Sequence, residues 1–333
     1  MAEFAIFIPV GPTEQEVQRT ADLLDSLFTY EPQVSTVIFV DDVLESRNLA
    51  TKFKFPSSCN VVSILNPRRG LGLGHLGGGC VASIAAYEYI NVHLNVDFTL
   101  KCDTDALIIG PFSIQLLDAL KSNPGVGIIG SFGQSCNPHS RYYRYFADAN
   151  RQLSNALEVV PDFESLSEDD KMLGEIRITD KMTLTIEQII AFAAIRKYIE
   201  KALSQGYELG EYVQGGSYAL SGDLIRRLGL AGYLDRPLLW RDIPSGEDVM
   251  MGLYTRSVGM NFLSMTEVGE PFAVQYRGLP YSPEVLVKRG HAITHSVKND
   301  PACSEEIIRA YFKEQRLRIL ARHTTDVYCP SGR

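Results

Sequence analysis

The stretch FTLKCDTDALIIG, Phe98 to Gly110, places two carboxylates between two apolar runs. We expect Phe98 to Cys102 to form a buried strand, with Asp103 and Asp105 directly after it. Residues two apart project to the same side of an extended chain, so both carboxylates can reach one point. Carboxylate oxygens are ligands that Mg²⁺ and Mn²⁺ accept. A pair of solvated acids at the end of a strand is the alternative interpretation.

Apolar strands and helices alternate before this stretch. Strands are expected at residues 5–10, 34–40 and 60–65, and helices at about 13–30 and 79–92. Continuous apolar strands of this kind indicate an α/β fold with a mainly parallel sheet covered on both faces. Ligands bind beyond the carboxyl ends of such strands. One crevice should therefore contain residues 9–13, Asp41, Asp42, residues 66–79 and residues 103–105.

The second half of the chain is less regular. A further strand is expected at residues 126–132, a helix at 183–207, a short strand after Gly216 and a helix from about Gly246. The pattern breaks down over residues 133–182, which we interpret as an insertion. The simplest division is one domain over residues 1–300, with a first half at 1–132 and a second at 183–300. A helical tail follows at residues 301–333.

Composition and charge restrict the class of protein. The chain has 333 residues, of which 45% are hydrophobic and 22% charged, as in an ordinary soluble globular protein. Its net charge of -8 does not favour nucleic acid as a partner. The six cysteines form no C-x-x-C pair, and the N-terminal apolar run stops after Val10. No run approaches the ~18 apolar residues of a membrane span. These features predict a cytoplasmic protein with free thiols.

The segment GLGHLG, residues 72–77, matches G-x-G-x-x-G, the pattern of dinucleotide-binding turns. That pattern belongs directly after a strand, whereas Pro67 to Gly70 intervene here. We interpret the segment as a glycine-rich loop before a helix, able to bind an anion through backbone N–H groups. Arg68 or Arg69 would supply positive charge. A glycine-rich surface loop is the alternative.

The segment SGEDVMMG, residues 245–252, contains Glu247 and Asp248. Ser245 and Asp248 have the spacing of a capping box, which is the structural interpretation. The functional interpretation makes Asp248 a general base, because the N-terminus of a helix favours the anionic form of a carboxylate.

Two further motifs can contribute to a site. HAITHSVK, residues 291–298, offers His295 and Lys298, three residues apart, and an additional His291. Gly215 and Gly216 permit close approach of the backbone to a substrate, although a bulge or turn would also explain them.

The order of these motifs resembles that of the GT-A-fold, metal-dependent glycosyltransferases, from about Phe4 to Lys298. The resemblance implies a Rossmann-like, mainly parallel central sheet flanked by helices, with a C-terminal helical appendage. It implies transfer of a sugar from a nucleoside-diphosphate sugar to a saccharide or other hydroxyl acceptor, with inversion and Asp248 as the base. A nucleotidyltransferase that forms sugar nucleotides and a non-catalytic binder of nucleotide sugars are the alternatives.

The resemblance also implies roles for single residues. Asp103, Asp105 and His295 would hold Mn²⁺ or Mg²⁺. Gly215, Gly216 and Glu247 would face the donor sugar or the acceptor. The nucleotide and diphosphate would contact Pro9, Val10, Gly11, Thr13, Asp41, Asp42, Arg68, Asp103 and Lys298.

Acceptor recognition and location depend on less specific segments. Trp240 and the aromatic, arginine-rich stretch at residues 137–146 could stack on sugar rings. The tail at residues 304–323 is a basic helix that could lie on the inner face of a membrane, where lipid-linked acceptors are found. Docking of this helix on its own domain or on a sister subunit is the alternative.

Overall fold

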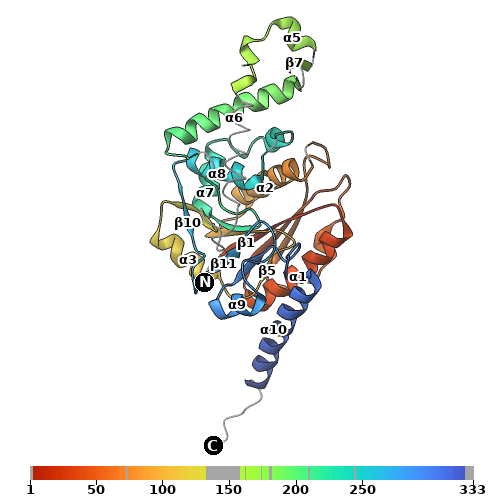
Figure 1. Ribbon diagram of the computed structural model, residues 1–333, viewed down its shortest axis with the longest axis vertical. Helices are drawn as coiled ribbons and strands as arrows, with labels where there is room; N and C mark the ends of the chain where they lie inside the picture. The colour runs from red at the N-terminus through yellow and green to blue at the C-terminus, as the bar shows by residue number, and fades with distance from the viewer. Residues whose placement is uncertain are drawn as a thin grey trace, which may run out of the picture.

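A computed structural model of the chain describes residues 3–72, 74–132, 158–161, 163–173, 175–179, 182–208, 211–243 and 245–326. Its central sheet has seven strands in the order β10-β6-β9-β4-β1-β2-β3 (Figure 1). The bounds of these strands are β1 Phe4–Val10, β2 Thr36–Asp41, β3 Asn60–Leu65, β4 Phe98–Cys102, β6 Val126–Gly130, β9 Ser217–Ser221 and β10 Asn261–Ser264. Only β9 among them pairs antiparallel with its neighbours. The predicted α/β fold with a mainly parallel sheet is confirmed.

Helices cover both faces of this sheet (Figure 1). The helices in the described part of the chain are α1 Glu14–Tyr30, α2 Gly74–His93, α3 Ser113–Ser122, α5 Glu168–Leu173, α6 Ile186–Ser204, α7 Gly222–Leu230, α8 Glu247–Ser257, α9 Pro283–Arg289 and α10 Glu305–Asp326. Of these, α5 lies away from the central sheet, beyond α6 (Figure 1). Short 3-10 turns lie at η1 Leu49–Thr51, η2 Phe163–Ser165 and η3 Pro237–Trp240. Two smaller sheets consist of β11 Phe272–Val274, β12 Ile293–His295 and β5 Leu107–Ile108, and of β7 Glu175–Thr179 and β8 Met182–Thr185.

The alternation of side chains along β1 produces the two cores. Ala5 and Phe7 pack with residues of α2, α6, α7 and α8. Phe4, Ile6 and Ile8 point to the opposite face, because successive side chains of a strand alternate, and they pack with α1 and α3. This two-sided burial explains why β1 is apolar at almost every position.

Helix α2 begins earlier than its sequence predicts, at Gly74 rather than Gly79. A Cβ atom on Gly77 would overlap the Arg241 carbonyl oxygen, and one on Gly78 would lie 2.7 Å from the Arg68 guanidinium. The glycines of this first turn therefore permit close packing against neighbouring segments, which outweighs their poor helix propensity. The loop interpretation was wrong for residues 74–78.

Helix α10 docks on α1 through ion pairs. Arg309 Nη1 lies 2.6 Å from an Asp22 oxygen, and Arg316 lies 2.6 Å from Asp22 and 3.0 Å from Asp25. Arg19 of α1 pairs in turn with Glu305. Docking of the tail on its own domain is thus confirmed, and two of its arginines are used in this contact. None of the helices in the described part of the chain is long and apolar enough to cross a membrane.

Candidate functional site

Asp103 and Asp105 lie at the carboxyl end of the central strand β4. The Asp103 N–H donates to the Gly216 carbonyl over 3.0 Å, and the Ala106 N–H donates to the Asp103 carbonyl over 3.0 Å. This turn directs both carboxylates into the same space. Asp105 is only 1% exposed, whereas one third of the Asp103 side chain is exposed. The alternative interpretation, a pair of solvated acids at the end of a strand, therefore does not hold for Asp105.

His295 completes a group of three possible metal ligands. Its Nε2 lies 3.4 Å from Asp105 Oδ1 and 3.8 Å from Asp103 Oδ2. Ligand atoms of the three residues lie within 4.8 Å of one another. Two carboxylates and an imidazole form a donor set that Mn²⁺ accepts well and Mg²⁺ also tolerates. The arrangement fits one divalent ion.

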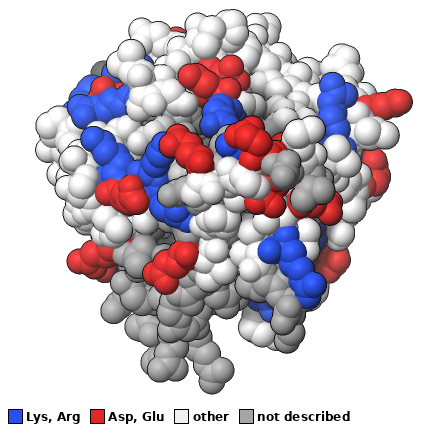
Figure 2. All heavy atoms as spheres, turned by 90° about the horizontal axis from the view of Figure 1, so that it is seen from above, with Lys and Arg blue, Asp and Glu red and all other residues white. Residues whose placement is uncertain are grey.

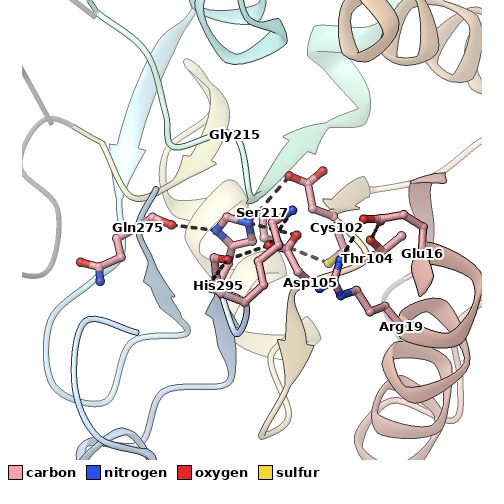
Figure 3. Close-up of polar contacts among 12 residues, drawn as sticks. Glu16, Arg19, Cys102, Thr104, Asp105, Gly215, Ser217, Gln275 and His295 are labelled. Atoms are coloured by element: carbon pink, nitrogen blue, oxygen red, sulfur yellow. Dashed lines mark hydrogen bonds and ion pairs between the residues drawn. The ribbon is translucent and has the colours of Figure 1, made fainter. Parts of the chain in front are cut away.

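The tautomer of His295 is determined by its second contact (Figure 3). Nδ1 lies 2.7 Å from the Gln275 carbonyl oxygen, which can only accept, so Nδ1 carries a hydrogen. The other nitrogen, Nε2, then faces the carboxylates. Burial opposes protonation of Nε2, but the charges of Asp105 and Asp103 raise the pKa of His295 above its ordinary value. His291 does not join this group, since its Nδ1 contacts the Glu270 carbonyl.

The loop after β12 also holds Asp105 in place. Ser296 Oγ donates to Asp105 Oδ2 over 2.7 Å, and the Val297 N–H donates to the Asp105 carbonyl over 3.0 Å. Lys298 Nζ lies 3.2 Å from Asp105 Oδ2. Burial favours the neutral acid, but His295, Lys298 and the Ser296 hydroxyl hold the pKa of Asp105 well below its usual range. Sequence reasoning found Lys298 and missed Ser296.

Lys101 is a further residue of the site that sequence reasoning overlooked. It is 2% exposed, and its Nζ lies 2.6 Å from Asp103 Oδ1 and 2.9 Å from Glu247 Oε1. Nζ also donates to the Gly215 carbonyl. Burial lowers the pKa of Lys101, but the charges of Asp103 and Glu247 outweigh it and raise that pKa. A lysine in an otherwise apolar strand is a usable signal, because a buried ammonium requires partners.

Asp248 lies in the first turn of α8 and is 6% exposed. The N-cap is Gly246 and makes no side-chain cap, so the capping box between Ser245 and Asp248 does not form. Asp248 Oδ1 instead accepts from the Val249 N–H over 2.9 Å. Burial and the charge of Glu247 raise the pKa of Asp248 well above its ordinary value. The expectation that the helix N-terminus keeps this carboxyl acidic was wrong, because burial dominates.

Gly215 and Gly216 lie against the side chains of the site. A Cβ on Gly215 would lie 2.8 Å from Glu247 Oε1 and 3.2 Å from Asp248 Oδ2. A Cβ on Gly216 would overlap the His295 ring. The two glycines thus bring the metal-ligand group and the start of α8 next to each other. Their contact with a sugar stays a prediction.

Substitution of Gly216 by Ala is expected to weaken Mn²⁺ binding by at least about tenfold, because the new methyl displaces the ring of His295, one of the three possible metal ligands. Titration of Mn²⁺ into the purified variant checks this. Gly125→Ala is the matched control, since its Cβ would meet only Asn261 Nδ2 at 3.7 Å. Equal Mn²⁺ affinity of Gly216→Ala and wild type would show that His295 does not bind the ion.

The two acids at the carboxyl end of β2 are already paired. Asp41 is fully buried and forms an ion pair with Arg47, whose Nη2 also donates to the Gly11 carbonyl over 2.8 Å. Asp42 Oδ1 accepts from Arg68 Nε over 2.8 Å. Arg69 instead donates to the Leu44 carbonyl, so Arg68 is the arginine that contacts Asp42. Arg47, which links the loops after β1 and β2, was not predicted.

The predicted platform at Trp240 is wrong. Trp240 has no exposed surface, and its indole N–H donates to the Tyr254 hydroxyl over 2.8 Å. The ring belongs to the core beneath η3 and α8, so it offers no face to a sugar. The aromatic stretch at residues 137–146 lies outside the described residues.

The face of the molecule seen in Figure 2 carries both acidic and basic side chains. Figure 2 shows basic and acidic side chains intermixed over the described residues of that face, rather than one extended basic area.

No protein-family model and no curated protein matches the sequence. Glycosyltransferases are among the solved structures to which the chain is similar. The apo structure of the WbbM bifunctional glycosyltransferase is 10% identical, with 96% of this chain and 52% of that chain covered and a TM-score of 0.47. The chain thus spans about half the length of that protein. Mouse xyloside xylosyltransferase 1 in its apo form is 12% identical over 90% of this chain and 100% of that chain, with a TM-score of 0.44. The galactosyltransferase LgtC, in complex with donor and acceptor sugar analogues, is 11% identical over 93% of this chain and 95% of that chain, with a TM-score of 0.44.

Proposed function

We propose that this chain is a metal-dependent GT-A glycosyltransferase that moves a sugar from a nucleoside-diphosphate sugar to a hydroxyl acceptor. The proposal rests on the positions of Asp103, Asp105 and His295 near the carboxyl end of β4, where one possible ligand atom of each lies within 4.8 Å of the other two. The buried Asp248 reaches the same place from α8, across Gly215 and Gly216. Ligands for a cation and a candidate base therefore share one site.

In this proposal Asp103, Asp105 and His295 hold the divalent ion. A bound Mn²⁺ or Mg²⁺ supplies positive charge where the departing diphosphate becomes more negative. Lys298 adds a fixed positive charge beside Asp105 and is 38% exposed, so its ammonium can turn toward a diphosphate. The imidazole among the ligands favours Mn²⁺ over Mg²⁺.

Asp248 is the proposed general base. It would accept the proton of the acceptor hydroxyl while that oxygen attacks the anomeric carbon, and the diphosphate would leave from the opposite face. Displacement of this kind inverts the anomeric centre. Burial and the charge of Glu247 raise the pKa of Asp248 above that of an ordinary aspartate, which makes its ionised form a stronger base. Glu247 is proposed to contact the sugar or the acceptor.

The nucleotide is proposed to bind beyond β1 and β2. These strands run parallel to β4, so their carboxyl ends reach the same edge of the sheet. The Arg47–Asp41 and Arg68–Asp42 pairs give this edge fixed, preoriented polar groups. The proposed contacts are Pro9, Val10, Gly11, Thr13, Asp41, Asp42 and Arg68.

The acceptor is proposed to be a saccharide or another hydroxyl compound, and the location cytoplasmic. A lipid-linked acceptor and peripheral contact of α10 with a membrane are the finer part of this proposal. Lys313 and Arg318 support them, because both are exposed on α10 while Arg309 and Arg316 face α1.

Thermal denaturation with a panel of nucleoside diphosphates, each with and without Mn²⁺, tests the proposed function. We expect one diphosphate to raise the melting temperature only when Mn²⁺ is present. A ligand that binds only the native state at about 100 times its Kd adds about 2.7 kcal/mol of stability. No shift with any diphosphate would contradict the proposal.

A further inference from the structure

Lys101 has an unusually complete set of partners. An ammonium has three N–H donors, and each finds an oxygen here: Asp103 Oδ1, Glu247 Oε1 and the Gly215 carbonyl. No donor remains for a substrate, and the side chain is 2% exposed. Lys101 therefore cannot act as a catalytic residue that touches the sugar or the diphosphate.

The partners of Lys101 come from opposite sides of the site. Asp103 follows β4 and belongs to the metal-ligand group. Glu247 begins α8 and is next to the proposed base, Asp248. Gly215 precedes β9, and a Cβ atom on it would lie 2.8 Å from Glu247 Oε1. One ammonium thus connects the part of the site that would hold the ion with the part that would hold the acceptor.

The oxygens around Lys101 Nζ form a cation-binding arrangement. Two carboxylates and a backbone carbonyl are the ligand types that hard cations select. Without a positive charge between them, the carboxylates of Asp103 and Glu247, both partly buried, would repel each other. Glu247 is not among the three residues that would ligate the divalent ion, so that ion does not replace the ammonium.

We propose that Lys101 is a built-in cation, which occupies a second cation position beside the divalent-metal site. It limits the site to one divalent ion and keeps the start of α8 at a fixed distance from Asp103. Lys101 is in this sense a positioning residue for Asp248. The inference rests on the proposed function for the metal, but the cation position is defined by this chain's own atoms.

Removal of the ammonium tests the proposal. In Lys101→Ala, n-propylammonium replaces the missing carbons and the charge, so we expect it to restore much of the lost melting temperature. The neutral isostere n-propanol should not restore it. In metal titrations followed by electron paramagnetic resonance, wild type should bind one Mn²⁺ per chain and Lys101→Ala two, with a return to one when n-propylammonium is present. Lys121→Ala, at an exposed position of α3, is the matched control and should bind one.

A second variant covers the case that Lys101→Ala does not fold. Lys101→Met fills the space without a charge, so it should bind one Mn²⁺ and ignore n-propylammonium. Its kcat should fall about 10²-fold with little change in KM for the donor, because the base is displaced while the donor site is kept. A purely structural lysine would lower the melting temperature and leave kcat of the folded enzyme unchanged.

The outcomes separate the two proposals. Wild type that binds no Mn²⁺ contradicts the proposed function, while the n-propylammonium effect on melting still decides the role of Lys101. A folded Lys101→Ala that binds one Mn²⁺ and does not respond to n-propylammonium overturns the built-in cation. So does a Lys101→Met enzyme with the kcat of wild type.

Discussion

Replacement of Asp105 by Asn is expected to abolish the Mn²⁺-dependent rise in melting temperature and to lower the rate of sugar transfer by about 10³-fold. Asp105 is 1% exposed and lies 3.4 Å from His295 Nε2 and 3.2 Å from Lys298 Nζ. Asn keeps the volume but loses the negative charge, so the ion and Lys298 lose their shared partner. Thermal denaturation with the stabilising diphosphate, followed by a rate measurement, checks both effects.

Asp118→Asn provides the matched control, because Asp118 is an exposed residue of α3. It should retain the rise in melting temperature and the transfer rate. An Asp105→Asn protein that still shows the full Mn²⁺-dependent rise would mean that the ion, if bound, lies elsewhere.

The second large effect is expected at Asp248. Asp248→Asn should lower kcat by about 10²- to 10⁴-fold, which is the usual contribution of a general base. Binding of Mn²⁺ and diphosphate should persist, because Asp248 is not among the three possible metal ligands. Rate measurements at saturating donor, together with the melting assay, separate loss of catalysis from loss of binding.

The pH dependence gives a further readout of the same residue. Asp248 can accept a proton only when it is ionised, and burial and Glu247 raise its pKa well above the ordinary value. The rate in wild type should therefore begin to fall, as pH is lowered, at a higher pH than an ordinary aspartate would give. Below that pKa the rate should drop tenfold per pH unit, and the residual rate of Asp248→Asn should lack this dependence.

Asp223→Asn is the control for a general effect of acids at helix starts. Asp223 is the second residue of α7, as Asp248 is of α8, but 41% of its side chain is exposed and it pairs with Arg227. It should leave the rate unchanged. A rate for Asp248→Asn within a few-fold of wild type would remove Asp248 from the base role and with it the support for inversion.

The parts of the fold that the sequence predicted depend on local patterns. Strands β3 and β4 begin and end where the apolar runs do. The antiparallel direction of β9 was not predicted, because it depends on pairing with β4 across more than a hundred residues. Helix α2 was shortened in the prediction because glycine disfavours helices in isolation, whereas here it permits close packing.

The residues of the site also fall into those that local spacing predicts and those whose surroundings depend on the whole fold. Asp103 and Asp105 were predicted because their spacing alone places them together. Lys101 was missed because its partner Glu247 is distant in sequence, and only the fold brings them to 2.9 Å. The predicted exposure of Trp240 and the predicted acidity of Asp248 were both wrong because both side chains are buried. Burial depends on the whole fold, so local sequence does not predict it.

The position of β9 has a consequence for synthesis of the chain. Strand β4 has β1 on one side and β9 on the other, and β9 is translated long after β4. At about 5–20 residues per second, the edge of β4 that awaits β9 stays unpaired on the ribosome for on the order of 10 s. An unpaired apolar edge is a template for association with other chains. Nascent chains that stall before Ser217 therefore keep this edge unpaired, and we expect them to be prone to aggregate.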